Sequence, residues 1–435
     1  MDIVHNKNQE RARLMRFFCL AAAAALAVNA VAVDFFRPGF DDGKALPADR
    51  IYPAGRIFPF TGFSPFSVAV TAKAGFSMAG PVYSDGQMRK LKAGSELLPI
   101  VWPLRAVDGR TTLTRKLLDN PRLDLDPYVE SIEKQVRKAA SNPNIAWWYL
   151  MPEELRPWRK LDMEFLHRAV TTIRENDPQR RPVWMYLPNH YNAEQLRPFA
   201  AELEIIGKGM YPSQFDKERE RIWCRWSMES ETEAIRQAGS RSIPIAVVEM
   251  FRQPSPEMLP KLESLVRHDI YLALISGAKG IAVFSLAERG GFSAHRRYFS
   301  AYAFEAGRLG GPEGIGQIFL FGRPMNDLKV KIVEGPERLK TTPVPRKDEV
   351  REYPSIASSE LGWRDNHVLA LVNSSDDAPV TVEISGLPAE PVRITDLITN
   401  QELGRSDSGT FRYIISPYQA VCLKFNQGNS TRGDK

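Results

Sequence analysis

Short apolar runs alternate eight times with longer amphipathic stretches between residues 55 and 310. The runs are rich in β-branched and aromatic residues, and several are apolar almost throughout, as is typical of parallel strands covered on both faces. They are Ile57–Ser64, Phe76–Tyr83, Leu97–Leu104, Ile145–Met151, Pro182–Leu187, Leu203–Tyr211, Ile243–Met250 and Gly280–Leu286. The sequence therefore predicts eight consecutive strand–helix units.

The stretches between the runs have helical spacing. Leu161, Phe165, Ala169 and Ile173 recur every four residues and mark one face of a helix. Eight strand–helix units over about 250 residues match a (β/α)8 TIM barrel, an α/β fold. A doubly wound open sheet is the alternative, but it would need a glycine-rich phosphate loop after the first strand, and residues 58–63 do not form one.

The period changes after the Gly-rich stretch 310–316, which we interpret as a linker. Short alternating runs separated by turn residues predict a smaller antiparallel β-sandwich. These runs are Leu328–Val333, His367–Asn373, Val380–Ile384, Val392–Leu397, Thr410–Ile415 and Ala420–Phe425. We expect a barrel domain over 50–315, a C-terminal β-sandwich domain over 325–426 and a disordered tail over 427–435.

The N-terminus resembles an export signal. Basic residues within 1–16 precede the apolar run Phe17–Val33, and Ala30-Val31-Ala32 is a suitable signal-peptidase site. We expect a signal peptide over 1–32 and a secreted or periplasmic protein. An uncleaved N-terminal anchor is the alternative, although the run is short for a membrane span.

Composition excludes several classes of protein. A chain of 435 residues that is 43% hydrophobic and 25% charged is an ordinary globular protein. Its net charge of +6 is spread thinly, which argues against nucleic-acid binding. The three cysteines and six histidines show no metal-ligand spacing, so we predict no metal and no cofactor. Nothing in the sequence demands more than a monomer.

Carboxylates follow two of the predicted strands. Glu153 and Glu154 follow the fourth strand, and Glu249 ends the seventh within an apolar run. The carboxyl ends of strands four and seven face each other across the mouth of an eight-stranded barrel, where the chemistry of TIM barrels takes place. Two carboxylates across such a mouth suit glycoside hydrolysis, in which one acts as an acid and the other as a nucleophile.

This arrangement resembles the retaining glycoside hydrolases of clan A. A Glu after strand four, a Glu ending strand seven and a C-terminal β-sandwich are all similar to that superfamily, as is Gly209-Met210-Tyr211-Pro212 at strand six. The resemblance implies that Glu249 is the nucleophile and that Tyr211 hydrogen-bonds to it. It also implies that the two carboxyl groups lie about 5–5.5 Å apart.

The resemblance does not settle the general acid/base. The clan usually has Asn before this Glu, whereas here the order is Met151-Pro152-Glu153-Glu154. Successive strand residues point to opposite faces, so a regular strand would bring one of the two glutamates to the mouth. We favour Glu154, with Glu153 as the alternative. Either could instead open the following helix, where acidic side chains are favourable.

Other candidate substrate-binding residues follow the predicted strands. They are Arg105, Asn189, His190, Tyr211, Trp102 and Trp158. The tryptophans could stack on sugar rings, although core and loop packing would explain them equally well. Glu288 is a competing carboxylate in a Gly-rich loop, and we rank it below Glu249.

We therefore expect a glycoside hydrolase that cleaves a poly- or oligosaccharide by a retaining two-carboxylate mechanism. The alternative is a catalytically inactive barrel that binds glycans in cell-envelope or exopolysaccharide assembly. A polysaccharide lyase or an esterase lacks support, because neither a Gly-x-Ser-x-Gly motif nor a metal cluster occurs in the sequence.

Overall fold

The computed structural model describes residues 58–310, 315–343, 349–363, 366–406 and 408–427. The predicted signal peptide, and all but the first residue of the predicted tail, lie outside these residues. Among the described residues, no helix combines the length and the apolar character needed to cross a membrane.

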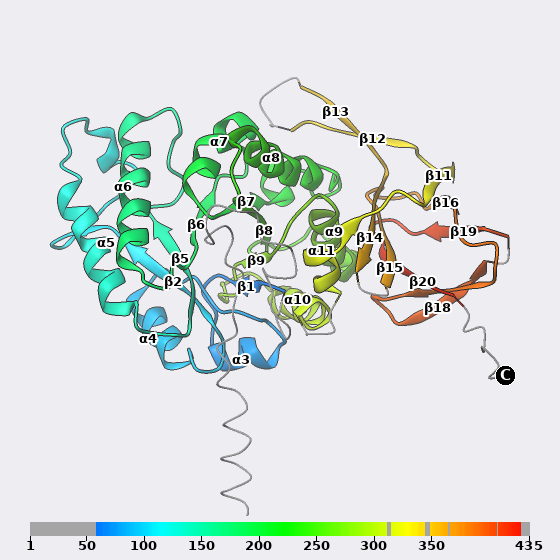
Figure 1. The fold of residues 1–435 in the computed structure, drawn as a ribbon, viewed down its shortest axis with the longest axis horizontal. Helices are drawn as coiled ribbons and strands as arrows, with labels where there is room; N and C mark the ends of the chain where they lie inside the picture. Colours follow the sequence, from blue (N-terminus) through cyan, green and yellow to red (C-terminus); the bar gives the residue numbers. More distant parts are fainter. Residues whose placement is uncertain (1–57, 311–314, 344–348, 364–365, 407, 428–435) are drawn as a thin grey trace, which may run out of the picture. The chain divides into compact units, whose positions relative to one another are not determined.

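Seven parallel strands form one curled sheet in the order β1-β9-β8-β7-β6-β5-β2 (Figure 1). The strands are β1 (Phe60–Gly62), β2 (Ile100–Arg105), β5 (Ile145–Met151), β6 (Val183–Leu187), β7 (Ile205–Met210), β8 (Ile243–Glu249) and β9 (Ile281–Phe284). Each coincides with a run that the sequence predicts. The predicted α/β barrel fold is confirmed.

The eighth position of the barrel is occupied by an irregular segment, where the sequence predicts a strand over 76–83. The backbone N–H groups of Ser77 and Met78 donate to Phe60 O of β1, and Val101 of β2 donates to Ala79 O. The segment therefore joins the two edge strands of the curled sheet. A regular strand does not form because Gly80 has a φ of 97° and the next residue is proline, which has no N–H to donate.

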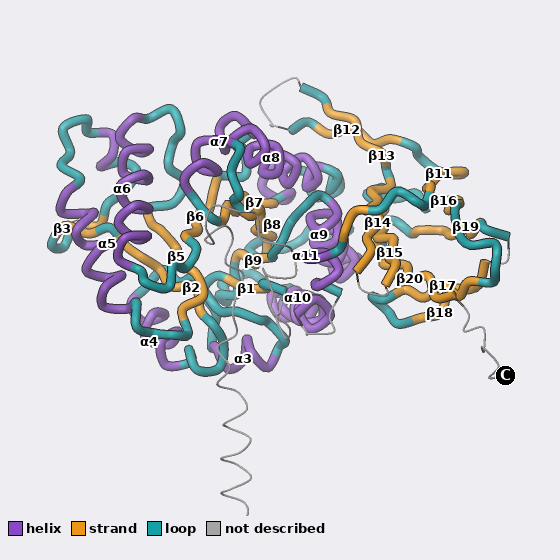
Figure 2. The backbone as a smooth tube through the Cα atoms, in the orientation of Figure 1, coloured by secondary structure: helices purple, strands orange, loops and turns teal. Residues whose placement is uncertain are grey.

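Helices surround the sheet and follow its strands in turn (Figure 2). They are α3 (Val68–Lys73), α4 (Asp85–Ala93), α5 (Asp126–Ala139), α6 (Lys160–Asn176), α7 (Ala193–Glu202), α8 (Trp223–Ala238), α9 (Leu262–Ile275) and α10 (His295–Gly310). Ser84 and Asn192 begin α4 and α7 with capping boxes, which satisfy N–H groups of the first turn. In α6, the periodic residues Phe165, Ala169 and Ile173 are all buried.

Short elements lie in the loops between these helices and strands. They are β3 (Val107–Asp108), β4 (Thr111–Thr112) and the 3-10 helices η1 (Leu117–Asp119), η2 (Pro212–Phe215) and η3 (Leu259–Lys261). The hairpin β3–β4 and helix η1 lie between β2 and α5, whereas η2 follows β7 directly. Both η1 and η2 therefore belong to loops that leave the carboxyl ends of barrel strands, where a TIM barrel builds its active site.

Two antiparallel sheets and a hairpin follow the helix α11 (Gly316–Phe321). One sheet has the order β10-β14-β15-β20-β17-β18 and the other β11-β16-β19. The strands are β10 (Arg323–Pro324), β11 (Lys329–Glu334), β12 (Arg338–Thr341), β13 (Arg351–Pro354), β14 (Ile356–Trp363), β15 (Asn366–Asn373), β16 (Val380–Ser385), β17 (Val392–Asp396), β18 (Gln401–Ser406), β19 (Thr410–Ile415) and β20 (Ala420–Gln427). Apolar side chains from both sheets form a shared core. All six predicted strands are present, and β14 and β18 are the longest of those not predicted.

The barrel and the C-terminal sheets share a second hydrophobic cluster. It joins residues of α9 and α10 to Val368 and Ala370 of β15 and to Cys422 of β20. The indole N–H of Trp223 also donates to Pro343 O, at 2.8 Å. The predicted domain boundaries stay a prediction, because the contacts are continuous across them.

Candidate active site

The carboxyl end of β5 carries Glu153 beside two tyrosines. Tyr149 donates a hydrogen bond to Glu153 Oε1, and Tyr83 lies next to the same carboxyl group. Burial raises the pKa of Glu153 to about 7, although hydrogen bonds from Tyr149 and Tyr83 favour the ionised form and limit the rise. Glu153 is half-buried, so it combines contact with solvent and a pKa suited to a general acid.

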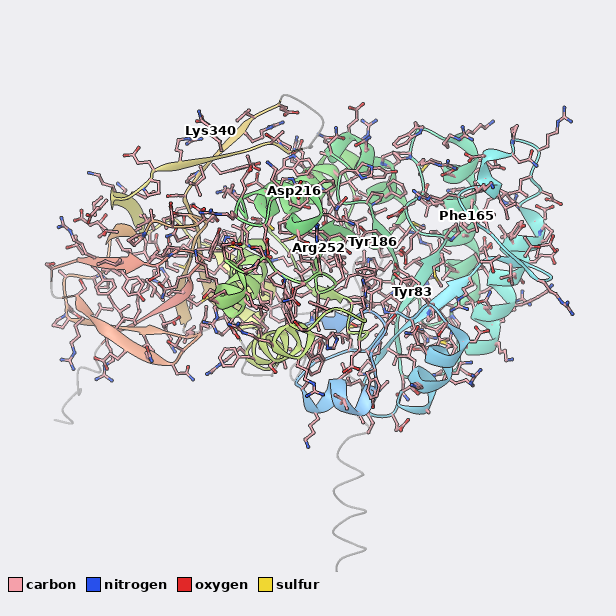
Figure 3. The ribbon with its side chains drawn as sticks, turned by 180° about the vertical axis from the view of Figure 1, so that it is seen from behind. Tyr83, Phe165, Tyr186, Asp216, Arg252 and Lys340 are labelled. Carbon is pink, nitrogen blue, oxygen red and sulfur yellow. The ribbon has the colours of Figure 1, made fainter. Side chains whose placement is uncertain are left out.

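Aromatic rings surround this end of the barrel. We call the following six residues the aromatic floor: Phe63, Tyr149, Trp184, Tyr186, Tyr211 and Phe284. The Tyr149 and Trp184 rings have centroids 4.9 Å apart, and Tyr186 stacks on Tyr211 at 6.0 Å. Figure 3 labels Tyr83 and Tyr186, whose side chains are both close enough to Glu153 for its charge to raise their pKa values. Five of the six residues of the aromatic floor are buried, so the floor forms an apolar layer at this end of the barrel.

Glu154 has a different environment from its neighbour. Its backbone is left-handed, with a φ of 57°, and its carboxylate forms an ion pair with Arg115 at 3.1 Å. Since β5 has already ended at Met151, strict strand alternation does not apply here. The backbone therefore directs Glu153 to the tyrosines and Glu154 to Arg115, and it is Glu153 that has the environment of a general acid.

Glu249 ends β8 and is nearly sealed from solvent, with 4% of its surface exposed. Its carboxylate accepts hydrogen bonds from the backbone N–H of Ser213, at 3.2 Å, and from the Ser213 hydroxyl, at 2.6 Å. Arg221 lies 3.7 Å away. Burial raises the pKa of Glu249 to about 7, although Arg221 and Ser213 oppose the rise by favouring the carboxylate.

A buried polar chain extends from Glu249 toward the C-terminal sheets. Arg221 pairs with Asp269 of α9, which also contacts His268 Nδ1 at 2.9 Å, and His268 Nε2 lies 2.9 Å from Ser374 Oγ. Burial lowers the pKa of His268, whereas Asp269 and Glu249 keep the pKa of Arg221 raised despite its burial. In this network of polar side chains, the Arg221 cation thus lies between the carboxyl groups of Glu249 and Asp269.

The partners of Glu153 and those of Glu249 do not overlap. The aromatic floor nevertheless lies next to Glu249 in the sheet. Phe284, one of its residues, pairs with Glu249 across β8 and β9, and the Phe284 ring packs against Tyr186 and Tyr211. Ser213, not Tyr211, donates the hydrogen bonds that Glu249 accepts. The role that the resemblance implies for Tyr211 thus falls to a residue two positions further along the chain.

The remaining predicted residues lie in several places. Arg105 pairs with Asp85 at 2.9 Å, and Trp102 is buried beneath Lys92 in the cluster that packs β2 against helices. Asn189 is buried and donates to Gln214 at 2.5 Å, whereas His190 is exposed. Trp158 is 61% exposed and meets Tyr191 edge-on. Trp158 and His190 are thus the most accessible of these side chains.

Sequence reasoning missed four residues that define the two carboxyl environments: Tyr83, Tyr149, Ser213 and Arg221. Tyr149 lies inside a predicted strand, four residues before Glu153, so its position was a usable signal. Tyr83 ends the predicted run 76–83, so its position at a strand end was a signal too. Ser213 lies in η2 and Arg221 just before α8, and no periodicity places them.

One group in the described residues has the composition of a metal site. Potential ligand atoms of Asp327, Glu360 and His367 all lie within 4.8 Å of one another. His367 Nε2 is 2.5 Å from Glu360 Oε1, and Leu328 N–H donates to Glu360 Oε2 at 3.0 Å. Hydrogen bonds therefore already satisfy Glu360, and the group lies among the C-terminal strands, outside the barrel.

Comparison with known proteins gives matches in structure alone. No family model and no curated protein matches the sequence. The fold is similar to that of a structure described as a glycoside hydrolase, with 11% identity over 85% of this chain and 92% of that chain and a TM-score of 0.52. It is equally similar to a family 39 glycoside hydrolase from the gut symbiont Bacteroides cellulosilyticus WH2, with 8% identity over 85% of this chain and 81% of that chain and a TM-score of 0.52. The resemblance to glycoside hydrolases that the sequence predicts is confirmed at the level of the fold.

Proposed function

We propose that the protein is an exported glycoside hydrolase that cleaves glycosidic bonds in a poly- or oligosaccharide, with Glu153 as its general acid/base. The observation that carries this proposal is the half-buried Glu153 carboxyl group among tyrosines, with its pKa raised to about 7. Such a group holds a proton near neutral pH and can still reach solvent, as an acid catalyst must. The fold, which is similar to that of glycoside hydrolases, supports the same conclusion.

The retaining mechanism assigns the second role to Glu249. Glu153 donates its proton to the glycosidic oxygen while the bond from that oxygen to the anomeric carbon breaks, and the Glu249 carboxylate attacks that carbon to form a glycosyl ester. Glu153, now ionised, then takes a proton from the water that displaces Glu249. Ser213 and Arg221 support this role because both stabilise the ionised form of Glu249.

A second function, glycan binding without cleavage, has one observation in its favour. Glu249 is 4% exposed, and its hydrogen bonds come from Ser213. A nucleophile has to touch the anomeric carbon, so a carboxylate sealed in this way would need the loop that contains Ser213 to move.

The test is a reducing-end assay of the purified full-length chain on a broad panel of glycans. Glu153→Gln, Glu249→Gln and Glu154→Gln would be compared with Glu288→Gln, which changes an exposed carboxylate after β9. We expect product from the wild type, Glu154→Gln and Glu288→Gln, and a loss of at least about a hundredfold for Glu153→Gln and Glu249→Gln.

Azide then separates the two roles in a retaining enzyme. Azide should restore turnover of an activated substrate by Glu153→Ala with retained configuration, and by Glu249→Ala with inverted configuration. Full activity of Glu153→Gln would overturn the proposed acid/base. Binding of a glycan by a wild type that releases no product would establish the second function instead.

A further inference from the structure

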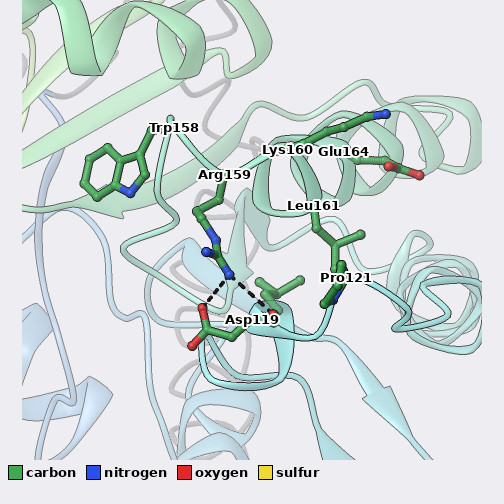
Figure 4. Close-up of a pocket in the computed structure, with 8 residues that line it drawn as sticks. Asp119, Pro121, Trp158, Arg159, Lys160, Leu161 and Glu164 are labelled. Carbon is green, nitrogen blue, oxygen red and sulfur yellow. Dashed lines mark hydrogen bonds and ion pairs between the residues drawn. The ribbon is translucent and has the colours of Figure 1, made fainter.

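A cavity of about 440 Å³ opens beside the β5–α6 loop (Figure 4). Leu118, Pro121 and Leu161 give it apolar walls, and Trp158, Arg159 and Glu164 contribute an indole ring and two charged groups. Trp158 is 61% exposed, so most of its surface is available for contact. Large, exposed aromatic side chains beside a cavity are typical of binding sites rather than of packing.

Hydrogen bonds hold the wall of this cavity in place. Arg159 donates to the Asp119 carboxylate at 2.9 Å and to Asp119 O at 3.4 Å, as the dashed lines in Figure 4 show. Arg156 pairs with Asp119 as well and, at 2.9 Å, with Asp162, whose side chain is fully buried. The β5–α6 loop and helix η1 are therefore cross-linked, and the cavity between them is formed in advance of any ligand.

The β5–α6 loop also carries Glu153, and the loop that contains η1 contacts the residue after it. Arg115, four residues before Asp119, pairs with Glu154, and Tyr191, which contacts Trp158, donates its hydroxyl hydrogen bond to Leu155 O. Trp158 is five residues from Glu153, so their Cα atoms are at most about 18 Å apart. A chain of a few sugar units is therefore long enough to contact both residues.

We propose that the cavity beside Trp158 is a second glycan-binding subsite, which holds a pyranose ring of the same chain that occupies the site at Glu153. Trp158 stacks on the apolar face of the ring, and Arg159, Lys160 and Glu164 offer charged groups to its hydroxyls. The subsite rests on the proposed function for its substrate class. It favours chains long enough to contact Glu153 and Trp158 together.

The test measures binding in the catalytically impaired Glu153→Gln full-length chain. Isothermal titration would use linear glucans, xylans, mannans, galactans and N-acetylglucosamine oligomers of two to ten units. In this background we expect Trp158→Ala to weaken binding of the longest bound oligomer about tenfold, which corresponds to about 1.4 kcal/mol. Binding of the dimer, which has fewer rings to contact both places, should change less. Trp158→Tyr, which keeps an aromatic face, should retain most of the affinity.

Phe304→Ala is the matched control, since it removes another exposed aromatic side chain, on helix α10. It should leave binding unchanged, and thermal unfolding should show that each variant is folded. Equal affinity of the Trp158→Ala variant and its parent for long chains would overturn the subsite, as would the failure of every oligomer to bind. If binding depends on Trp158 but the wild-type protein cleaves no glycan, the subsite is supported and the proposed hydrolase activity is rejected.

Discussion

Tyr149 and Glu153 are joined by a hydrogen bond at the end of strand β5, four residues apart in the chain. The donor belongs to the aromatic floor and is fully buried, whereas the acceptor is half-buried. The bond favours the ionised form of Glu153 and opposes the effect of burial on its pKa. A residue inside the barrel therefore limits how far burial raises the pKa of the candidate acid.

Tyr149→Phe should raise the pKa of Glu153 further above 7. The substitution removes a donor to the carboxylate, and a hydrogen bond to a charged group is worth about 1.5–3 kcal/mol, which corresponds to a shift of about one unit or more. A 13C NMR titration of the Glu153 carboxyl carbon would measure this shift directly. In an active enzyme, the alkaline limb of the kcat/KM profile should move to higher pH in parallel, because the acid must be protonated. An unchanged titration would show that Tyr149 does not control Glu153.

Glu249→Gln should remove part of the pH dependence of stability. Because the pKa of Glu249 rises from 4.5 to about 7 on folding, its contribution is fully present below about pH 4.5 and is lost as the pH rises through 7. Between pH 5 and pH 8 the wild type should lose about 2–3 kcal/mol of unfolding free energy relative to the variant. Urea unfolding at both pH values would measure the difference. Parallel curves for the two proteins would contradict the buried position of Glu249.

Arg221→Met should destabilise the protein by about 3–5 kcal/mol at neutral pH, because it leaves the buried carboxyl groups of Asp269 and Glu249 without their cation. The loss should shrink at acid pH, where Glu249 is protonated. Chemical denaturation gives the comparison. Arg236→Met is the control, since Arg236 is exposed and pairs only with Glu233 of its own helix, and it should leave the unfolding midpoint unchanged. A similar midpoint for Arg221→Met would be evidence against the chain from Glu249 to Ser374.

Gly207→Ala should destabilise the barrel by about 1–3 kcal/mol. A Cβ atom at this position of β7 would lie 2.6 Å from Trp184 Nε1 and 2.9 Å from Ile245 Cγ1, so a packed ring or a neighbouring strand has to move. Gly290→Ala offers open space for the same added methyl group and should be neutral. Thermal unfolding of both variants tests how tightly the interior is packed.

The strand–helix order was predictable because it depends on local periodicity. Apolar runs with β-branched residues, and residues such as Phe165, Ala169 and Ile173 at helical spacing, are properties of short segments, and each segment folds as its own pattern indicates. The predicted strand over 76–83 does not form, and the reason is also local, because Gly80-Pro81 interrupts its hydrogen bonding. Strand β14 was not predicted, although it pairs along its whole length with β15.

Much of the candidate site was beyond sequence reasoning. Strand alternation allowed one of the two glutamates at the mouth, and Glu154 was favoured. The left-handed backbone at Glu154 ends the alternation and leaves Glu153 beside Tyr149 and Tyr83. Glu249 was expected at the mouth of the barrel, and its position at the end of β8 agrees with that. Its partners, however, come from the loop after β7, from the start of α8 and from α9, which lie far apart in sequence.

The sequence by itself determined the succession of strands and helices and the strand ends at which the carboxylates occur, because both depend on neighbouring residues. The tertiary structure decided what surrounds those carboxylates. Burial and charge depend on the side chains that other segments bring within a few ångströms, and a pKa changes with each of them. Glu153 and Glu249 both occur at the end of a predicted strand. Glu153, however, contacts tyrosines and solvent, whereas Glu249 contacts Ser213 and Arg221 inside the protein.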